Sequence, residues 1–220
     1  MIRRLIISLL MVLVASTSFA GFATFNDYKD AIAENVSDAT MNDTTYSFII
    51  NQAAYEVAVK LRCVQKKDTV ITSDGVSVYA INSDMLQNGI EGIRCLSCGD
   101  QELTYGLERI LPKDQAEYGN ESGCPQTFSI WGQFIEVYPR GTSDPCSLIV
   151  DYSARPTFAL EDDILDVPSE YADLIIMYAK VLLYDLYGRV QEASKLKVDF
   201  DAAISERRAL LGLQDLLEKR

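Results

Sequence analysis

Residues 127–153 carry the clearest alternation of apolar and polar positions in the chain. Within 127–139 the alternation continues on both sides of Gly132, which predicts two strands turning over a glycine. Residues 147–153 predict a further strand with its apolar side chains on one face. The positions that define these faces are Phe128, Ile130, Phe134, Glu136 and Tyr138 in the first segment, and Leu148, Val150 and Tyr152 in the second.

The pattern changes to helical spacing in residues 167–184. Pro168 stands in the first turn, where a helix tolerates proline best because the missing N–H breaks no hydrogen bond. Apolar residues then recur at the spacing of one helix face, which predicts the most buried helix of the chain. Its predicted core face consists of Leu174, Met177, Tyr178, Val181 and Leu182.

Two further helices are predicted near the N-terminus. Thr24 and Asp27 form a capping-box pattern at the start of the first, and residues 42–45 start the second. The predicted apolar face of the first helix is Phe25, Tyr28, Ile32 and Val36, and that of the second is Ile50, Ala54, Val57, Leu61 and Val64.

The segment between these helices and residue 127 predicts strands. Asp74-Gly75 lies between the alternating segments 69–72 and 76–79, and this dipeptide is the strongest hairpin signal in the chain. We also expect strands around residues 90–96 and 103–105, and a short helix at 111–118.

The C-terminal residues predict one more long helix. Gly188 marks a break, the helix begins at about Val190, and Gly212 is expected to interrupt it. The spacing of its apolar residues is close to a heptad seam, although the seam is too short for a coiled coil. This seam consists of Ala193, Leu196, Phe200, Ala203 and Leu210.

Together these elements predict an α+β fold. The N-terminal helix pair and two long C-terminal helices form a helical bundle, and an antiparallel β insertion lies in the middle of the chain. The predicted boundaries are 1–20 for a signal-like apolar leader, 21–67 for the N-terminal helices, 68–160 for the β-rich insertion, and 161–220 for the C-terminal helices and tail.

The leader has the composition of a secretory signal. Arg3-Arg4 precede the apolar run 5–14, and small residues follow up to Ala20, where cleavage is expected. The apolar run is short for a membrane span. The alternatives are an uncleaved N-terminal helix or a misassigned start codon.

Composition and charge exclude several classes of function. The chain has 220 residues, 48% apolar and 24% charged, which is a globular composition, and its net charge of −12 disfavours tight binding of DNA or RNA. There is no histidine, so the commonest general base and the commonest zinc ligand are missing. No residue pattern indicates catalysis, and we expect neither enzymatic activity nor a cofactor.

The five cysteines are Cys63, Cys95, Cys98, Cys124 and Cys146, an odd number that cannot pair completely within one chain. Cys95 and Cys98 have the spacing of a metal or redox pair. Zinc would need two further ligands, and Cys124 and Cys146 are single residues with no histidine to help, so we expect no metal site. A redox pair usually opens a helix in a βαβ unit, which is not the context here. Plain thiols, or structural disulfides in an exported protein, remain open, and the redox state of all five is not determined by the sequence.

Two other clusters have ordinary interpretations. The acidic residues of 161–166 lack the glycine turn and terminal glutamate of a calcium loop, so a solvated loop before a helix N-terminus is the simpler interpretation. The aromatic residues Phe128, Trp131, Phe134 and Tyr138 indicate a core or an interface before a ligand platform.

The order of these segments resembles a known family. The second N-terminal helix, the Asp74-Gly75 turn, residues 123–139, residues 148–152 and the helix from Val167 follow each other as in head-to-tail adaptor (connector) proteins of tailed bacteriophages, including tail-tube adaptors of short-tailed phages. The resemblance covers residues 24–211 and rests on strand, turn and helix patterns without a catalytic signature.

The resemblance implies a virion neck component, assembled in the host cytoplasm. It would form a ring of about twelve copies between portal and tail, with closed symmetry. The helices would form the ring wall and the β part would extend toward the tail, while DNA passes through an acidic channel without specific binding. The residues implied in portal docking are Leu210, Leu211, Leu213, Leu216 and Leu217.

Two rivals come from other classes. The leader favours an exported periplasmic or cell-surface binding protein of α+β fold, whereas the odd, scattered cysteines suit a reducing cytoplasm. A hydrolase that uses carboxylates has only the abundance of acids in its favour.

Overall fold

The computed structural model describes residues 24–33, 42–111, 121–160 and 163–218 of the chain, without the side chains of 87, 88, 103 and 213–218. The chain divides into two compact units. One, the helical unit, consists of residues 1–63 and 156–220, and the other, the β unit, consists of residues 64–155. The predicted α+β class is therefore confirmed.

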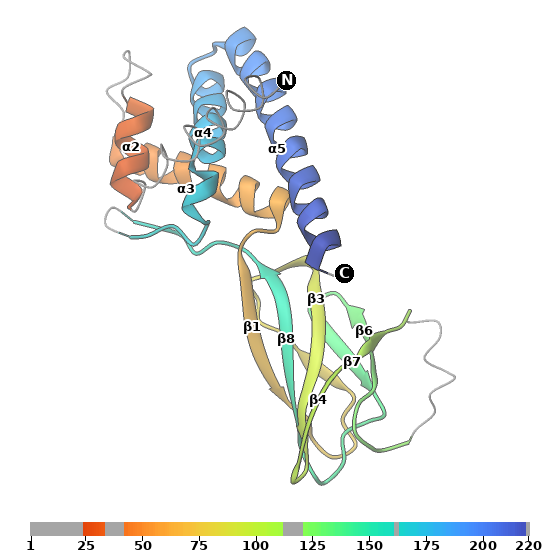
Figure 1. Cartoon of the computed structure of the whole chain (residues 1–220). Helices are drawn as coiled ribbons and strands as arrows, with labels where there is room; N and C mark the ends of the chain where they lie inside the picture. The colour runs from red at the N-terminus through yellow and green to blue at the C-terminus, as the bar shows by residue number, and fades with distance from the viewer. Residues whose placement is uncertain (1–23, 34–41, 112–120, 161–162, 219–220) are drawn as a thin grey trace, which may run out of the picture. The chain divides into compact units, whose positions relative to one another are not determined.

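The helical unit contains four α-helices among its described residues (Figure 1). They are α2 (Phe25–Ala33), α3 (Asp43–Leu61), α4 (Ala172–Leu186), which follows the short 3₁₀ turn η2 (Ser169–Tyr171), and α5 (Val190–Glu218).

Local capping signals are confirmed at three helix ends. The Thr24 backbone N–H donates to the Asp27 carboxylate over 2.8 Å, and the Asn42 side chain accepts from the Thr45 N–H over 2.9 Å. Gly188 separates α4 from α5 with a φ of +70°, which is the left-handed region that glycine enters without a Cβ penalty.

The helices do not form the predicted bundle in detail. In Figure 1, α3 runs across α4 and α5 and not alongside them. α4 contacts α2, α3 and α5, so it is covered on several sides and its buried face is wider than one predicted stripe. Met177, Tyr178 and Leu182 are only half-buried. The fully buried residues of α4 are Ala172, Leu174, Ile175, Ala179, Val181 and Leu183.

The prediction that Gly212 interrupts the last helix is wrong, since α5 continues through it to Glu218. A single glycine costs a helix only about 1 kcal/mol, and the flanking leucines and charged residues are good helix formers. The predicted seam is buried only in part: Ala193 and Phe200 are buried, Leu196 and Ala203 are half-buried, and Leu210 is 51% exposed.

In its described residues, the β unit contains two four-stranded sheets. The first has the order β1-β8-β3-β4 and the second β2-β7-β6-β5. Their strands are β1 (Gln65–Ile71), β2 (Val78–Ala80), β3 (Met85–Cys98), β4 (Gln101–Gly106), β5 (Glu108–Arg109), β6 (Thr127–Trp131), β7 (Phe134–Tyr138) and β8 (Cys146–Ala154). All pairings are antiparallel except β5 with β6.

The two strands predicted to turn over Gly132 and the strand predicted at 147–153 are confirmed. β6 and β7 pair from Thr127↔Tyr138 to Trp131↔Phe134, and Gly132 has a φ of +60° in the turn between them. On β8, Leu148, Val150 and Tyr152 are buried as expected. This strand lies between β1 and β3 in its sheet.

The prediction that the strands on either side of Asp74-Gly75 pair with each other as a hairpin is wrong. The turn forms, with a φ of +68° at Gly75, but β1 pairs with β8 and β2 pairs with β7. The chain thus changes sheets at this turn. Two longer apolar strands offer more pairing and burial than the two flanking segments offer each other. The predicted helix 111–118 lies outside the described residues, apart from Leu111.

Candidate functional site

The helical unit exposes large apolar side chains in two adjoining grooves. The larger, with a volume of about 540 Å³, lies between α3 and α4, and we call it the α3–α4 groove. A second groove of about 270 Å³ continues from it along α3. The α3–α4 groove is lined by Asn42, Thr44, Thr45, Phe48, Ile49, Leu182 and Leu186. The second groove is lined by Phe48, Asn51, Gln52, Tyr55, Pro156 and Phe158.

Phe48 belongs to both grooves and is 64% exposed. Leu186 at the end of α4 is 61% exposed, and Phe158 is 59% exposed. Exposed apolar residues that adjoin each other on a protein surface indicate a contact site for another molecule. The described residues that line the two grooves are uncharged, so the arrangement suits binding of an apolar surface.

Asn51 holds one wall of the second groove in place. Its side-chain amide donates to the Ala159 carbonyl over 2.9 Å, and its side-chain oxygen accepts from the Ala159 N–H over 2.8 Å. This pair of hydrogen bonds fixes the segment 156–160 beside α3. Phe158 is therefore presented to solvent by an anchored backbone.

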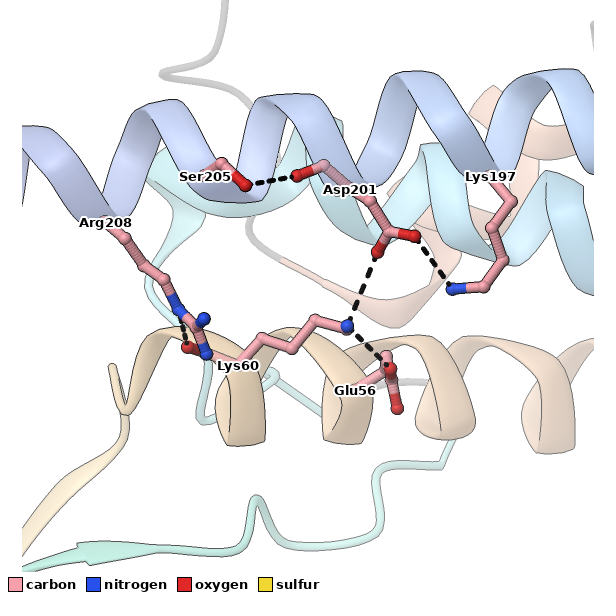
Figure 2. A network of polar contacts seen from close by, with 6 residues as sticks. All are labelled: Glu56, Lys60, Lys197, Asp201, Ser205 and Arg208. Atoms are coloured by element: carbon pink, nitrogen blue, oxygen red, sulfur yellow. Dashed lines mark hydrogen bonds and ion pairs between the residues drawn. The ribbon is translucent and has the colours of Figure 1, made fainter.

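A polar network on the same unit attaches α5 to α3 (Figure 2). The Lys60 ammonium lies 3.5 Å from the Glu56 carboxylate and 3.4 Å from that of Asp201, which in turn lies 3.4 Å from the Lys197 ammonium. Further along, the Arg208 guanidinium donates to the Lys60 carbonyl over 2.7 Å. The last turns of α3 thus contact α5 at several points.

Phe200 lies beneath this network. Its ring is fully buried and lies 4.8 Å from the Tyr178 ring of α4, centroid to centroid. Lys197 lies over both rings, and Lys60 lies 6.0 Å from the Phe200 centroid. Burial raises the pKa of Tyr178, and the nearby Glu56 charge adds to this shift. The hydroxyl therefore stays neutral within the contact between α4 and α5.

The residues implied in portal docking extend along the end of α5. Leu210 is 51% exposed and Leu211 is half-buried. The side chains of Leu213, Leu216 and Leu217 lie outside the described residues, although their backbone is helical. The fold of the single chain does not test whether these residues contact a portal.

The acidic segment 161–166 forms local hydrogen bonds at its described positions. Asp163 accepts from the Leu160 N–H over 2.7 Å, and Asp166 accepts from the backbone and hydroxyl of Thr157 over 2.8 and 2.6 Å. These carboxylates close loop turns and point to different partners. The arrangement agrees with the loop interpretation, and residues 161–162 lie outside the described part.

The predicted aromatic stripe on β6 and β7 divides in two. Phe128 and Tyr138 are buried, whereas Trp131 and Phe134 are 52% and 48% exposed. The last two are cross-strand partners at the end of the hairpin. They form an exposed apolar tip on the β unit.

Four cysteines of the β unit come together. Cys98 and Cys124 form a disulfide, and Cys95 and Cys146 are buried thiols. Cys63 belongs to the helical unit, where burial raises the pKa of its thiol to about 12. The spacing of the cysteines in the sequence did not reveal this gathering.

Sequence reasoning also missed the grooves and the polar network. Phe48 stands off the predicted apolar face of its helix, and such an apolar residue on the polar side of an amphipathic helix was the available signal. No sequence pattern indicates the polar network between Lys60 and Asp201, since the two residues are far apart in the chain.

Comparison with known proteins identifies the class. The model of the family described as SU10 adaptor protein matches residues 23–216, which is most of the chain. The chain belongs to this family of phage head-to-tail adaptors, as the order of its segments predicted, and it is a structural adaptor protein of the phage virion neck. No curated protein matches the chain. Among the described residues, no helix combines the length and apolar composition that a membrane span requires.

Proposed function

We propose that this protein is a non-enzymatic head-to-tail adaptor that assembles as a ring between the portal and the tail, with DNA passing through the ring. The observation that carries the proposal is the pair of exposed apolar grooves on the helical unit of a chain that belongs to an adaptor family.

The α3–α4 groove supports contact between neighbouring copies. Removing apolar surface from water contributes about 25 cal/mol per Å², so the exposed Phe48 and Leu186 favour a partner that covers them. A ring places the same heterologous contact between every pair of neighbours. The groove would then receive an apolar side chain from the next copy.

Two other surfaces suit the ends of such a ring. The C-terminal part of α5, with Leu210 and Leu211, is the proposed portal contact, together with Leu213, Leu216 and Leu217. The exposed Trp131 and Phe134 tip of the β unit is the proposed tail contact. A net charge of −12 repels phosphate, which supports passage of DNA without binding.

Ring assembly is tested by mass photometry and negative-stain microscopy of the wild type and Phe48→Asp. The wild type should form rings, and the variant should lose them because a charge cannot be buried in the groove. Val198→Asp is the matched control, since Val198 is 68% exposed on α5 and lies outside both grooves. A wild type that stays monomeric at all concentrations, alone and with portal, would contradict the proposal.

Portal contact is tested separately by co-sedimentation with purified portal rings. Leu210→Asp combined with Leu211→Asp should abolish co-sedimentation, while Ser194→Asp near the start of the same helix should not. Wild-type rings should also leave the mobility of double-stranded DNA unchanged in a gel at physiological salt. If all variants bind portal equally, the C-terminal helix does not form the portal contact.

A further inference from the structure

The cysteine cluster of the β unit brings together residues from three separate segments. Cys95 and Cys98 lie on β3, Cys146 begins β8, and Cys124 lies in the loop before β6. Cys98 and Cys146 are direct cross-strand partners in the β3–β8 ladder. The sulfur atoms of Cys98, Cys124 and Cys146 all lie within 4.8 Å of one another.

A disulfide accounts for only two of these three sulfurs. Cys98 and Cys124 are joined, and the Cys146 thiol lies beside the bridge, fully buried. The Cys146 thiol also interacts with that of Cys95. The sequence argument against zinc was that Cys124 and Cys146 are single residues, and the fold removes this objection by placing both beside Cys98.

The framework around the cluster is fixed by backbone hydrogen bonds. The Thr72 N–H donates to the Cys146 carbonyl over 2.9 Å, and the Cys146 N–H donates to the Thr72 hydroxyl over 2.7 Å. The Gly99 N–H donates to the Pro145 carbonyl over 3.2 Å. Positions 98 and 146 are therefore held together whether or not the disulfide is present.

We propose that the reduced protein binds one zinc ion through the thiolates of Cys98, Cys124 and Cys146. Zinc–sulfur bonds of about 2.3 Å in a tetrahedral site place sulfur atoms about 3.8 Å apart. The Cys146 sulfur lies within 4.8 Å of the other two, and reduction of the Cys98–Cys124 bond frees those two sulfurs to move apart to this spacing. The fourth position is filled by Cys95 or by water. The metal ion would replace the disulfide as the link between the β3–β8 sheet and the loop that leads into β6.

The disulfide form is converted to the zinc form in two steps, reduction and metal binding. A dithiol reductant supplies two electrons and two protons to the Cys98–Cys124 bond, and it becomes a disulfide itself. Zinc then displaces one proton from each ligating thiol to the solvent. In a reducing cytoplasm, where disulfides are rare and cysteine clusters commonly bind metal, the zinc form is expected to predominate.

The test uses the full-length protein, reduced with a phosphine under anaerobic conditions, loaded with Zn²⁺ and desalted. Elemental analysis should give about one zinc per chain. Loading with Co²⁺ should give the strong visible bands of a tetrahedral thiolate site. Cys146→Ser should weaken zinc binding at least tenfold, and Cys63→Ser should not change it.

Further measurements distinguish loss of zinc binding from loss of folding. Air-oxidised Cys146→Ser should still form the Cys98–Cys124 disulfide, seen by mass spectrometry, which reports an intact β unit. Loss of cobalt band intensity in Cys95→Ser assigns the fourth ligand to Cys95, and unchanged bands assign it to water. Reduced wild type without bound zinc, or Cys146→Ser with wild-type affinity, would overturn the proposal.

Discussion

The two units of this protein use different means to hold their elements. The helical unit relies on side-chain packing around α4 and Phe200, with partly exposed ion pairs above it. The β unit relies on strand ladders, tight backbone contacts and a sulfur cross-link. The helical unit also has the two apolar grooves. The difference teaches that the unit that carries these two apolar grooves is also the one whose elements are held mainly by side-chain packing.

The largest effect is expected in the helical unit for Phe200→Ala. Removing a fully buried ring leaves a cavity between α4 and α5 and should lower the free energy of unfolding of this unit by about 3–5 kcal/mol. Val198→Ala, two residues away on the exposed side of α5, should change it by less than about 0.5 kcal/mol. Urea unfolding followed by circular dichroism measures both. A similar loss in both variants would show that the helix itself, and not the buried ring, is the cause.

A backbone contact in the β unit gives the next largest effect. A Cβ at Gly141 would lie 2.3 Å from the Ser73 carbonyl oxygen, so Gly141→Ala must displace backbone and should cost about 1–3 kcal/mol. Gly92→Ala is the control, since a Cβ there meets nothing within 4 Å. Thermal unfolding of both variants tests the contact. Equal melting temperatures would mean that the Ser73 loop moves aside at no cost.

The polar network of Figure 2 should contribute less. The Lys60 and Asp201 side chains are 28% and 48% exposed, so their ion pair is screened by solvent. A double-mutant cycle with Lys60→Met and Asp201→Asn should give a coupling energy of about 0.2–1 kcal/mol, which falls further at high salt. A second cycle, with Lys197→Met and Asp201→Asn, measures the coupling of the other ion pair of Asp201. A coupling that does not depend on salt would indicate that the network is sealed from solvent in the assembled protein.

The titration of buried tyrosines has the smallest effect on the free energy of unfolding near neutral pH. Such tyrosines occur in both units. Burial raises the pKa of Tyr28 and Tyr171 in the helical unit and of Tyr152 in the β unit to about 12. Because the unfolded state ionises near pH 10, the stabilisation is fully present below pH 10 and is lost as the pH rises toward about 12.

This pH dependence is measured by urea unfolding between pH 8 and pH 12. The free energy of unfolding should be level up to about pH 10 and then fall. In Tyr152→Phe the fall should be shallower, since the ring stays buried and the hydroxyl near Asp84 is removed. A fall that begins below pH 9 would point to another group.

Elements with strong local signals were predictable from the sequence. The capping box at Thr24 and Asp27, the glycine turn at Gly132 and the break at Gly188 each depend on residues within a few positions of one another. Their geometry is set by short-range hydrogen bonds and by the conformational freedom of glycine. The same holds for β8, whose period of two is visible in Leu148, Val150 and Tyr152.

Choices between distant partners were not predictable. The Asp74-Gly75 turn forms, but its flanking strands join different sheets, with β1 paired to β8 and β2 paired to β7. The buried face of α4 depends on which helices cover it. Phe48 is exposed because none of the described elements covers that side of α3.

The sequence by itself determined the composition, the acidity, the order of helices and strands, and the resemblance to phage adaptors, because these follow from the order of residues along the chain. Only the tertiary structure decided which strands pair, which apolar residues remain exposed on α3 and α4, and that four scattered cysteines meet. Those outcomes depend on contacts between residues far apart in the chain, where many pairings are compatible with the same local pattern and the total burial selects among them.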